Sequence, residues 1–133
     1  MIAKHGDYLA KLAEKNLVNL EFEASVAGGI PILRTIKEGL ATNKIFKIYG
    51  ILNGTCNYIL SEMERSKDTF STVLKKAQIL GYAEPGKPKL DLNGYDALAK
   101  VRILSSLAFN KKISKHKCLM EGIENIELKD IKI

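Results

Sequence analysis

The segment that decides the fold of this chain is Gly81-Tyr-Ala-Glu-Pro-Gly-Lys-Pro-Lys-Leu-Asp-Leu-Asn-Gly-Tyr-Asp-Ala-Leu-Ala-Lys100. Its first glycine predicts the end of one helix, because glycine readily adopts the left-handed conformation that follows a helix. A loop with Glu84 and Asp91 comes next, and a second helix then carries Asp96 and Lys100 one turn apart. Three carboxylates and one amine are therefore gathered on a loop and a helix start. Such a set can hold a small zwitterion and move a proton.

Helices are predicted on both sides of this segment, from apolar residues at helical spacing and from residues that favour helix ends. One example is the stripe of Phe70, Val73 and Ala77. Thr55 is predicted to cap another helix, and the helix that follows Asn93 is apolar nearly all round, which is typical of a buried helix. The predicted helices cover residues 3–15, 31–40, 55–63, 69–80 and 93–110.

Three further segments predict strands, the first two because they alternate between apolar and polar residues. They are residues 19–26, 44–52 and 119–123. Since strands and helices succeed one another along the chain, we expect an α+β (α/β) fold in which helices cover a mixed β-sheet.

The charge balance is positive, with a formal net charge of +6 that comes almost wholly from lysine. Proteins that read nucleic acids usually cluster their positive charge and use arginine forks, whereas this chain has only three arginines. Its lysines are dispersed, apart from the group Lys111, Lys112, Lys115 and Lys117. We therefore expect solvated surface charge and no nucleic-acid partner, with an anionic ligand such as a nicotinamide dinucleotide as the alternative.

The sequence carries no signal for membranes or export. No apolar run approaches the roughly 20 residues that a membrane helix needs, and the first residues lack the apolar core of a signal peptide. Cys56 and Cys118 are the only cysteines, too few for a disulfide framework. We expect a cytoplasmic protein with no membrane partner.

Asp96 and Lys100 are the first candidates for chemistry. Partial burial makes a lysine amine release its proton more readily and a neighbouring carboxylate opposes this, so such an amine can exchange a proton near neutral pH. The alternative is a structural ion pair, which the same spacing fits.

The loop between the two helices is the second candidate. Pro85 and Pro88 stiffen it and reduce the entropy lost on fixing Glu84 and Asp91 in place. These carboxylates could capture a substrate ammonium or hydroxyl. The alternative is a solvated surface loop.

The turn at Ala27-Gly28-Gly29 is the third candidate. It exposes backbone carbonyls beside Glu23, and such a turn can ligate a hard cation through oxygen atoms. The alternative is a tight turn that needs glycine for its conformation alone. Neither a Gly-x-Gly-x-x-Gly fingerprint nor a phosphate-binding P-loop is present in the sequence.

Four blocks of the sequence resemble the homoserine dehydrogenase family, in the same order and with similar gaps. They are Phe22-Glu-Ala-Ser-Val-Ala-Gly-Gly-Ile-Pro-Ile32, Gly50-Ile-Leu-Asn-Gly-Thr-Cys-Asn-Tyr-Ile-Leu60, Ala77-Gln-Ile-Leu-Gly-Tyr-Ala-Glu84 and Asp91-Leu-Asn-Gly-Tyr-Asp-Ala-Leu-Ala-Lys100. The resemblance implies an NAD(P)-dependent oxidoreductase that interconverts L-homoserine and L-aspartate 4-semialdehyde, on the route to threonine, methionine and isoleucine.

The resemblance also implies roles for single residues. Lys100 would give a proton to the aldehyde oxygen and act as the base in reverse, with Asp96 as a second catalytic residue that also binds substrate. Other implied positions are Glu84, Asp91, Gly54 and Thr55 for the substrate, Gly81 for the nicotinamide cofactor (NADP or NAD), and Glu23, Val26, Gly28 and Ile30 for a monovalent cation, usually sodium.

The resemblance further implies a division of the chain. Residues 1–22 would be the C-terminal remnant of a dinucleotide-binding domain, and residues 23–133 a catalytic and dimerisation domain, so the fold is expected to be truncated at both ends. The family's N-terminal Rossmann domain and Thr-Ala-Asn-Lys motif are missing from this sequence. We expect a homodimer with a small-molecule substrate, inactive as this fragment alone. The alternative is a non-enzymatic dimerisation or assembly module derived from that domain.

Overall fold

The computed structural model describes residues 1–86, 88–111, 114 and 118–131. The chain forms two compact units, Met1–Leu52 with Ala99–Cys118 and Asn53–Leu98 with Leu119–Ile133. Three members of the predicted lysine group (Lys112, Lys115 and Lys117) lie outside the described residues. The predicted domain boundary after residue 22 stays a prediction.

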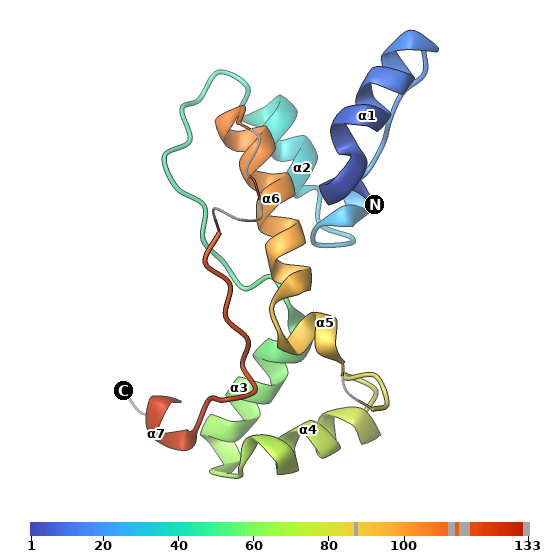
Figure 1. Cartoon of the computed structure of the whole chain (residues 1–133). Coiled ribbons are helices and arrows are strands. Elements are labelled where there is room, and N and C mark those ends of the chain that lie inside the picture. The colour runs from blue at the N-terminus through green and yellow to red at the C-terminus, as the bar shows by residue number, and fades with distance from the viewer. Residues whose placement is uncertain (87, 112–113, 115–117, 132–133) are drawn as a thin grey trace. The chain divides into compact units, whose positions relative to one another are not determined.

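The described residues are mostly helical (Figure 1). The helices are α1 (Ile2–Lys15), α2 (Ile32–Arg34), α3 (Gly54–Ser66), α4 (Phe70–Ile79), α5 (Lys89–Leu92), α6 (Tyr95–Phe109) and α7 (Leu128–Ile131), with a 3₁₀ turn at Glu23–Ser25 and a π-helical turn at Thr35–Gly39. Each of the predicted helices is confirmed to within one turn, the second as α2 continued by the π-helical turn. Within the described part of the chain, no helix has the length and apolar character needed to cross a membrane.

The predicted strands, and with them the mixed sheet, are wrong for the residues that the structure describes, none of which is in a strand. Segments 44–52 and 119–123 have no regular secondary structure. The half-buried apolar residues of the first segment are Ile45, Ile48 and Leu52, spaced by three and four rather than by two. A strand also needs ladder hydrogen bonds from a neighbouring strand, and an alternating sequence cannot supply that neighbour.

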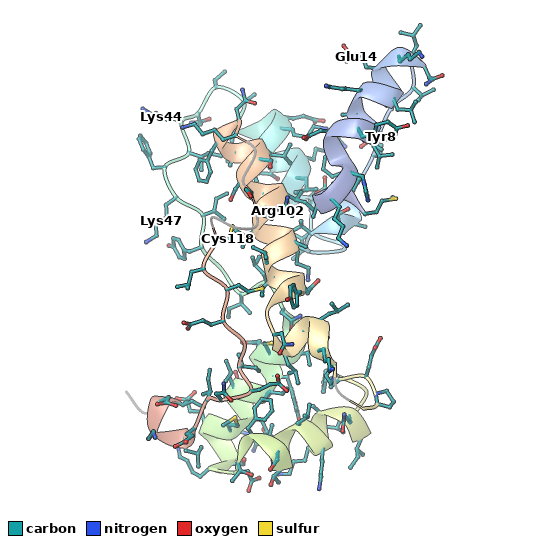
Figure 2. All side chains as sticks on the ribbon, viewed as in Figure 1. Tyr8, Glu14, Lys44, Lys47, Arg102 and Cys118 are labelled. Carbon is teal, nitrogen blue, oxygen red and sulfur yellow. The ribbon has the colours of Figure 1, made fainter. Side chains whose placement is uncertain are left out.

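Segment 44–52 leaves large apolar side chains in solvent. Phe46, Tyr49 and Ile51 are 80%, 86% and 77% exposed. Lys44 and Lys47, labelled in Figure 2, place their amines 5.2 Å from the ring centroids of Phe46 and Tyr49 respectively. Such contacts contribute only about 0.5–1 kcal/mol each at exposed sites, so this part of the first unit keeps an apolar surface.

The core of the first unit joins α2 and its π-helical continuation to the second half of α6. Its buried apolar residues are Val26, Leu33, Ile36, Ile103 and Leu104. The last two belong to the helix that the sequence predicted to be buried, and that prediction is confirmed for them. Val101 on the same helix is 39% exposed, so burial does not extend all the way round.

The second unit is built on a hairpin of α3 and α4. Lys67 ends α3 with φ 60°, and its N–H donates to the Met63 carbonyl, so the chain turns within three residues. Ile59 and Met63 of α3 and Val73 and Ala77 of α4 are all 0% exposed. Full burial of a side chain such as Met63 contributes about 1.5–3 kcal/mol. This core fixes the beginning of α3, on which the candidate site depends.

A close backbone contact ties the segment after residue 119 to the end of α5. The Ile123 N–H donates to the Leu92 carbonyl at 2.8 Å, and a Cβ atom at position 122 would lie 2.5 Å from the same oxygen. Gly122 is therefore required by the approach of two backbones.

We expect Gly122→Ala to lower the free energy of unfolding by about 1–3 kcal/mol, because the added methyl group forces these backbones apart. Urea unfolding followed by circular dichroism measures this. Gly50→Ala is the matched control, since a Cβ atom there meets nothing within 4 Å. It should change stability by no more than about 0.5 kcal/mol. Equal losses in the two variants would contradict the steric explanation.

Candidate active site

The candidate site is centred on the start of α3, where Asn53 is the N-cap. Its Oδ1 accepts a hydrogen bond from the Cys56 N–H at 2.8 Å, which satisfies one of the free amides of the first turn. The prediction that Thr55 caps this helix is wrong. The Thr55 hydroxyl instead donates to the Tyr82 carbonyl at 2.7 Å.

The same asparagine brings two predicted site residues together. Its Nδ2 donates to Asp91 Oδ1 at 2.8 Å and to Asp96 Oδ2 at 3.0 Å. All three side chains belong to the second unit and are half-buried. Gly54 and Thr55 follow Asn53 directly, so four predicted substrate-binding positions lie around this helix start. Asn53 was not among the predicted site residues, although an asparagine just before a helix is a recognised cap signal.

The loop after α4 is held through its backbone. Gln78 Nε2 donates to the carbonyls of Glu84 and Gly86, at 3.2 and 2.6 Å. Gly81 has φ 78°, which confirms the predicted helix stop. The Glu84 residue is exposed, so its carboxylate is offered to solvent by a loop whose main chain is fixed. Gln78 was not among the predicted site residues either, because a lone glutamine in a last helical turn carries no distinctive signal.

Lys100 belongs to the first unit. Its Nζ donates to the Leu52 carbonyl at 2.8 Å, and the residue is half-buried. A charged lysine amine has three N–H donors, and this bond uses one of them to fix the position of the amine.

Glu23, the predicted acidic ligand of a cation, has a structural role. Its two carboxylate oxygens accept hydrogen bonds from the N–H groups of Leu33 and Arg34, at 2.7 and 2.9 Å. The Ile30 carbonyl accepts from the Ile32 N–H at 2.8 Å. The carboxylate therefore caps α2 across the glycine turn, and Gly28 and Ile30 on that turn are exposed while Val26 is buried. The cation site stays a prediction.

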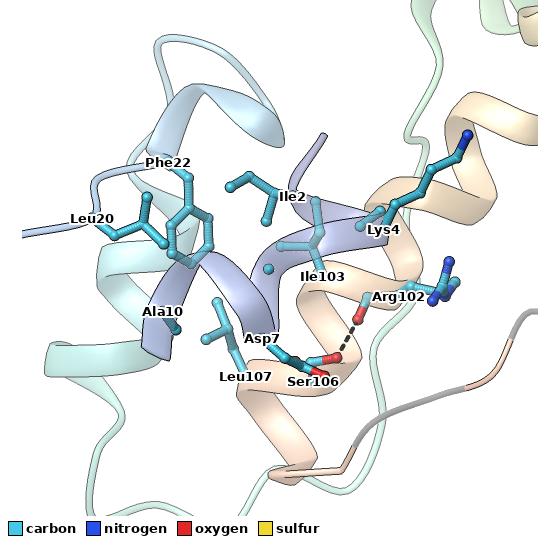
Figure 3. Close-up of a pocket in the computed structure, with 12 residues that line it drawn as sticks. Ile2, Lys4, Asp7, Ala10, Leu20, Phe22, Arg102, Ile103, Ser106 and Leu107 are labelled. Carbon is cyan, nitrogen blue, oxygen red and sulfur yellow. Dashed lines mark hydrogen bonds between the residues drawn. The ribbon is translucent and has the colours of Figure 1, made fainter. Parts of the chain in front are cut away.

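A cavity of about 220 Å³ in the first unit contains none of the predicted site residues (Figure 3). It lies between α1 and the second half of α6, with Phe22 and Leu107 among its apolar lining and Lys4 and Arg102 at polar positions. Ser106 Oγ in its wall donates to the Arg102 carbonyl at 2.8 Å. The chemistry predicted from the sequence is therefore not located there.

A family model described as homoserine dehydrogenase matches residues 31–133. The chain belongs to the homoserine dehydrogenase family. This confirms the resemblance drawn from the four sequence blocks. The members of the family that this chain matches extend well beyond it, as the relatives show.

One relative is the homoserine dehydrogenase of Neisseria gonorrhoeae, 48% identical over 99% of this chain and 30% of its own length. A homoserine dehydrogenase from Thiobacillus denitrificans, known from its crystal structure, is 44% identical to this chain in sequence. The two structures superpose with a TM-score of 0.91, and the match covers 97% of this chain and 30% of that one. A hyperthermophilic archaeal homoserine dehydrogenase mutant in complex with NADPH is 28% identical, with a TM-score of 0.84 over 98% of this chain and 39% of that one. The chain thus spans about 30% of the curated relative's length.

The thiol of Cys56 is affected by the charged groups of this site. Its Sγ lies 3.4 Å from the Asp91 carbonyl oxygen. Burial raises the pKa of the Cys56 thiol, and the carboxylates of Asp91 and Asp96 add to the rise. At a given pH the folded chain therefore holds less thiolate at this position than the unfolded chain does.

We expect alkylation of Cys56 by iodoacetamide, measured in a Cys118→Ser background, to reach half-maximal rate at a higher pH in the folded chain than in urea, because the thiolate is the nucleophile. Asp91→Asn should move the folded midpoint to lower pH, since it removes one negative charge. Asp68→Asn is the control, because Asp68 pairs with Lys76 instead and should leave the midpoint in place. An unmoved midpoint in Asp91→Asn would contradict the assigned charge effect.

Proposed function

We propose that this chain supplies the substrate-holding and proton-transferring residues of an NAD(P)-dependent homoserine dehydrogenase, which interconverts L-homoserine and L-aspartate 4-semialdehyde. The observation that carries the proposal is the pair of carboxylates that Asn53 holds at the start of α3, in a chain of this family. An amino-acid substrate carries an ammonium group, and a pair of half-buried carboxylates is the natural acceptor for it.

Proton transfer is assigned to Lys100. In the reducing direction a hydride adds to the aldehyde carbon, the carbonyl π electrons move to oxygen, and Lys100 gives that oxygen a proton to complete the alcohol. In the reverse direction the neutral amine takes the hydroxyl proton back. The hydrogen bond from Lys100 to the Leu52 carbonyl supports this role, because it orients the amine.

Substrate binding is assigned to the acidic residues and to the start of α3. Asp96 and Glu84 bind the substrate, Asp91 supports the site, and Gly54 and Thr55 line it. The hydrogen bonds from Gln78 to the carbonyls of Glu84 and Gly86 support the role of Glu84, because they hold the main chain that carries its exposed carboxylate.

The proposed cofactor is NADP or NAD, whose reduced form would supply the hydride and whose oxidised form would accept it in the reverse direction. An archaeal homoserine dehydrogenase similar to this chain is in complex with NADPH. Gly81 is the proposed contact with the nicotinamide ring. A Cβ atom at Gly81 would meet nothing within 4 Å, so its backbone is open to a flat ring.

The remaining parts of the proposal come from the family resemblance. The reaction would serve the synthesis of threonine, methionine and isoleucine in the cytoplasm. A sodium ion would bind at the glycine turn through the carbonyls of Val26, Gly28 and Ile30 beside Glu23. The hydrogen bonds that Glu23 accepts from the N–H groups of Leu33 and Arg34 support the position of the turn. The same bonds use one lone pair on each carboxylate oxygen, so the backbone carbonyls would be the main ligands of the ion.

We expect Lys100→Ala to reduce kcat by a factor of about 100 or more, because a positioned proton donor contributes 10²–10⁴-fold. The assay follows homoserine-dependent NADP reduction by a chimaera in which this chain replaces the matching segment of the Neisseria gonorrhoeae relative. Lys75→Ala, at an exposed position of α4, is the control and should keep the parent rate. A Lys100→Ala rate within twofold of the parent, with altered assembly, would favour the dimerisation module instead.

We also propose a homodimer, supported by the exposed apolar side chains of segment 44–52. We expect the double substitution Phe46→Glu with Ile51→Glu to shift the sedimentation of the chain towards the monomer, because two buried carboxylates would destabilise an apolar interface. Lys44→Glu with Lys47→Glu reverses charge on the same segment without removing apolar surface and is the control. A parent chain that sediments as a monomer would contradict the proposal.

A further inference from the structure

The side-chain amide of Gln78 connects the last turn of α4 to the loop that follows it. Gln78 is half-buried. Its Nε2 donates to the Glu84 carbonyl at 3.2 Å and to the Gly86 carbonyl at 2.6 Å. A glutamine amide has two N–H donors and one carbonyl, so both donors are in use. The reverse orientation would set the amide oxygen against two carbonyl oxygens, and the partners therefore allow one orientation only.

The bend between these two carbonyls is favoured by its own sequence. The ring of Pro85 restricts the φ angle of that residue, and Gly86 has φ 86°, a conformation that glycine adopts without steric cost. These local preferences set the bend but not its place relative to α4. The two hydrogen bonds from Gln78 supply that place, and the exposed Glu84 side chain is carried by the same bend.

The first part of the loop is held by other groups. The Gly81 N–H donates to the main-chain carbonyl of Gln78 at 3.2 Å, and the Tyr82 N–H donates to the Ala77 carbonyl at 2.8 Å. The ring of Tyr82 also stacks on that of Tyr58, with 4.5 Å between the ring centroids. None of these contacts uses the side chain of Gln78. A substitution of that side chain therefore releases the bend and leaves the first part of the loop in place.

We propose that Gln78 is a positioning residue, whose amide sets the direction from which Glu84 reaches the amino-acid substrate without affecting the cofactor contact at Gly81. This inference rests on the proposed function, in which Glu84 binds the substrate and Gly81 contacts the nicotinamide. Gln78 acts through main-chain carbonyls and touches neither ligand. It reduces the conformational entropy that the bend loses when substrate binds.

Gln78→Met tests this role, because methionine has a similar length and helix propensity but no N–H donor. In the chimaera described above, Gln78→Met should raise the KM for homoserine by about 5- to 50-fold, while kcat and the KM for NADP stay within about twofold. Lys75→Met places the same side chain at an exposed position of α4 and is the matched control, with all three constants unchanged. A residue that only stabilises α4 would lower the melting temperature and change neither KM.

A double-mutant cycle tests whether Gln78 acts through Glu84. Glu84→Gln keeps the main chain and removes the charge, and it should raise the KM for homoserine by about tenfold or more. Because the two residues serve one contact, adding Gln78→Met to this variant should raise the KM further by no more than about twofold. A further rise as large as the one that Gln78→Met causes in the parent would overturn the role of Gln78.

The outcomes distinguish the two proposals. A parent chimaera that does not oxidise homoserine, or a Glu84→Gln variant that keeps the parent KM, overturns the proposed function. An active parent whose Gln78→Met variant keeps the homoserine KM within twofold, or raises both KM values equally, overturns the role of Gln78.

A measurement on the chain itself does not depend on activity or on any variant. Gln78 is the only glutamine in the sequence, so its side-chain amide signals are readily assigned in nuclear magnetic resonance spectra. These protons should exchange with solvent at least about fivefold more slowly than those of Asn57, which is exposed on α3. Equal exchange rates would overturn the two hydrogen bonds on which the inference depends.

Discussion

The hydrogen bonds of one half-buried asparagine connect the secondary structure of this protein to its proposed chemistry. Asn53 starts α3 through its carbonyl oxygen and joins Asp91 of α5 to Asp96 of α6 through its nitrogen. A half-buried polar group that loses a partner destabilises the fold by about 1–3 kcal/mol. The same three bonds therefore stabilise the second unit and fix the distance between two acidic groups.

The apolar core of the α3–α4 hairpin makes that arrangement rigid. Met63 and Ile59 are wholly buried against α4, so the first turn of α3 cannot shift without disturbing close-packed side chains. On the other side of the hairpin, Gln78 fixes the main chain of the loop that carries Glu84. A scaffold of this kind lets a small unit present exposed acidic side chains from defined backbone positions.

The sequence predicted helices better than strands for a physical reason. Helices are made of local hydrogen bonds, so the stripe of Phe70, Val73 and Ala77 and the stop at Gly81 were sufficient evidence for α4. A strand depends on a neighbour that the local sequence cannot specify. In segment 44–52 the apolar residues pack at spacings of three and four, and no described strand lies beside it. The local sequence likewise did not predict that the Glu23 carboxylate accepts hydrogen bonds from α2, because its partner Leu33 lies ten residues further along the chain.

The sequence by itself determined the family, the positions of the predicted helices to within one turn and the identity of the acidic residues, because these depend on residue types and short spacings. Only the tertiary structure decided which side chains meet. The contact between Asn53 and Asp91 spans 38 residues, and that between Lys100 and the Leu52 carbonyl spans 48. No periodicity encodes such pairings, because they arise only when separate elements of a unit pack together.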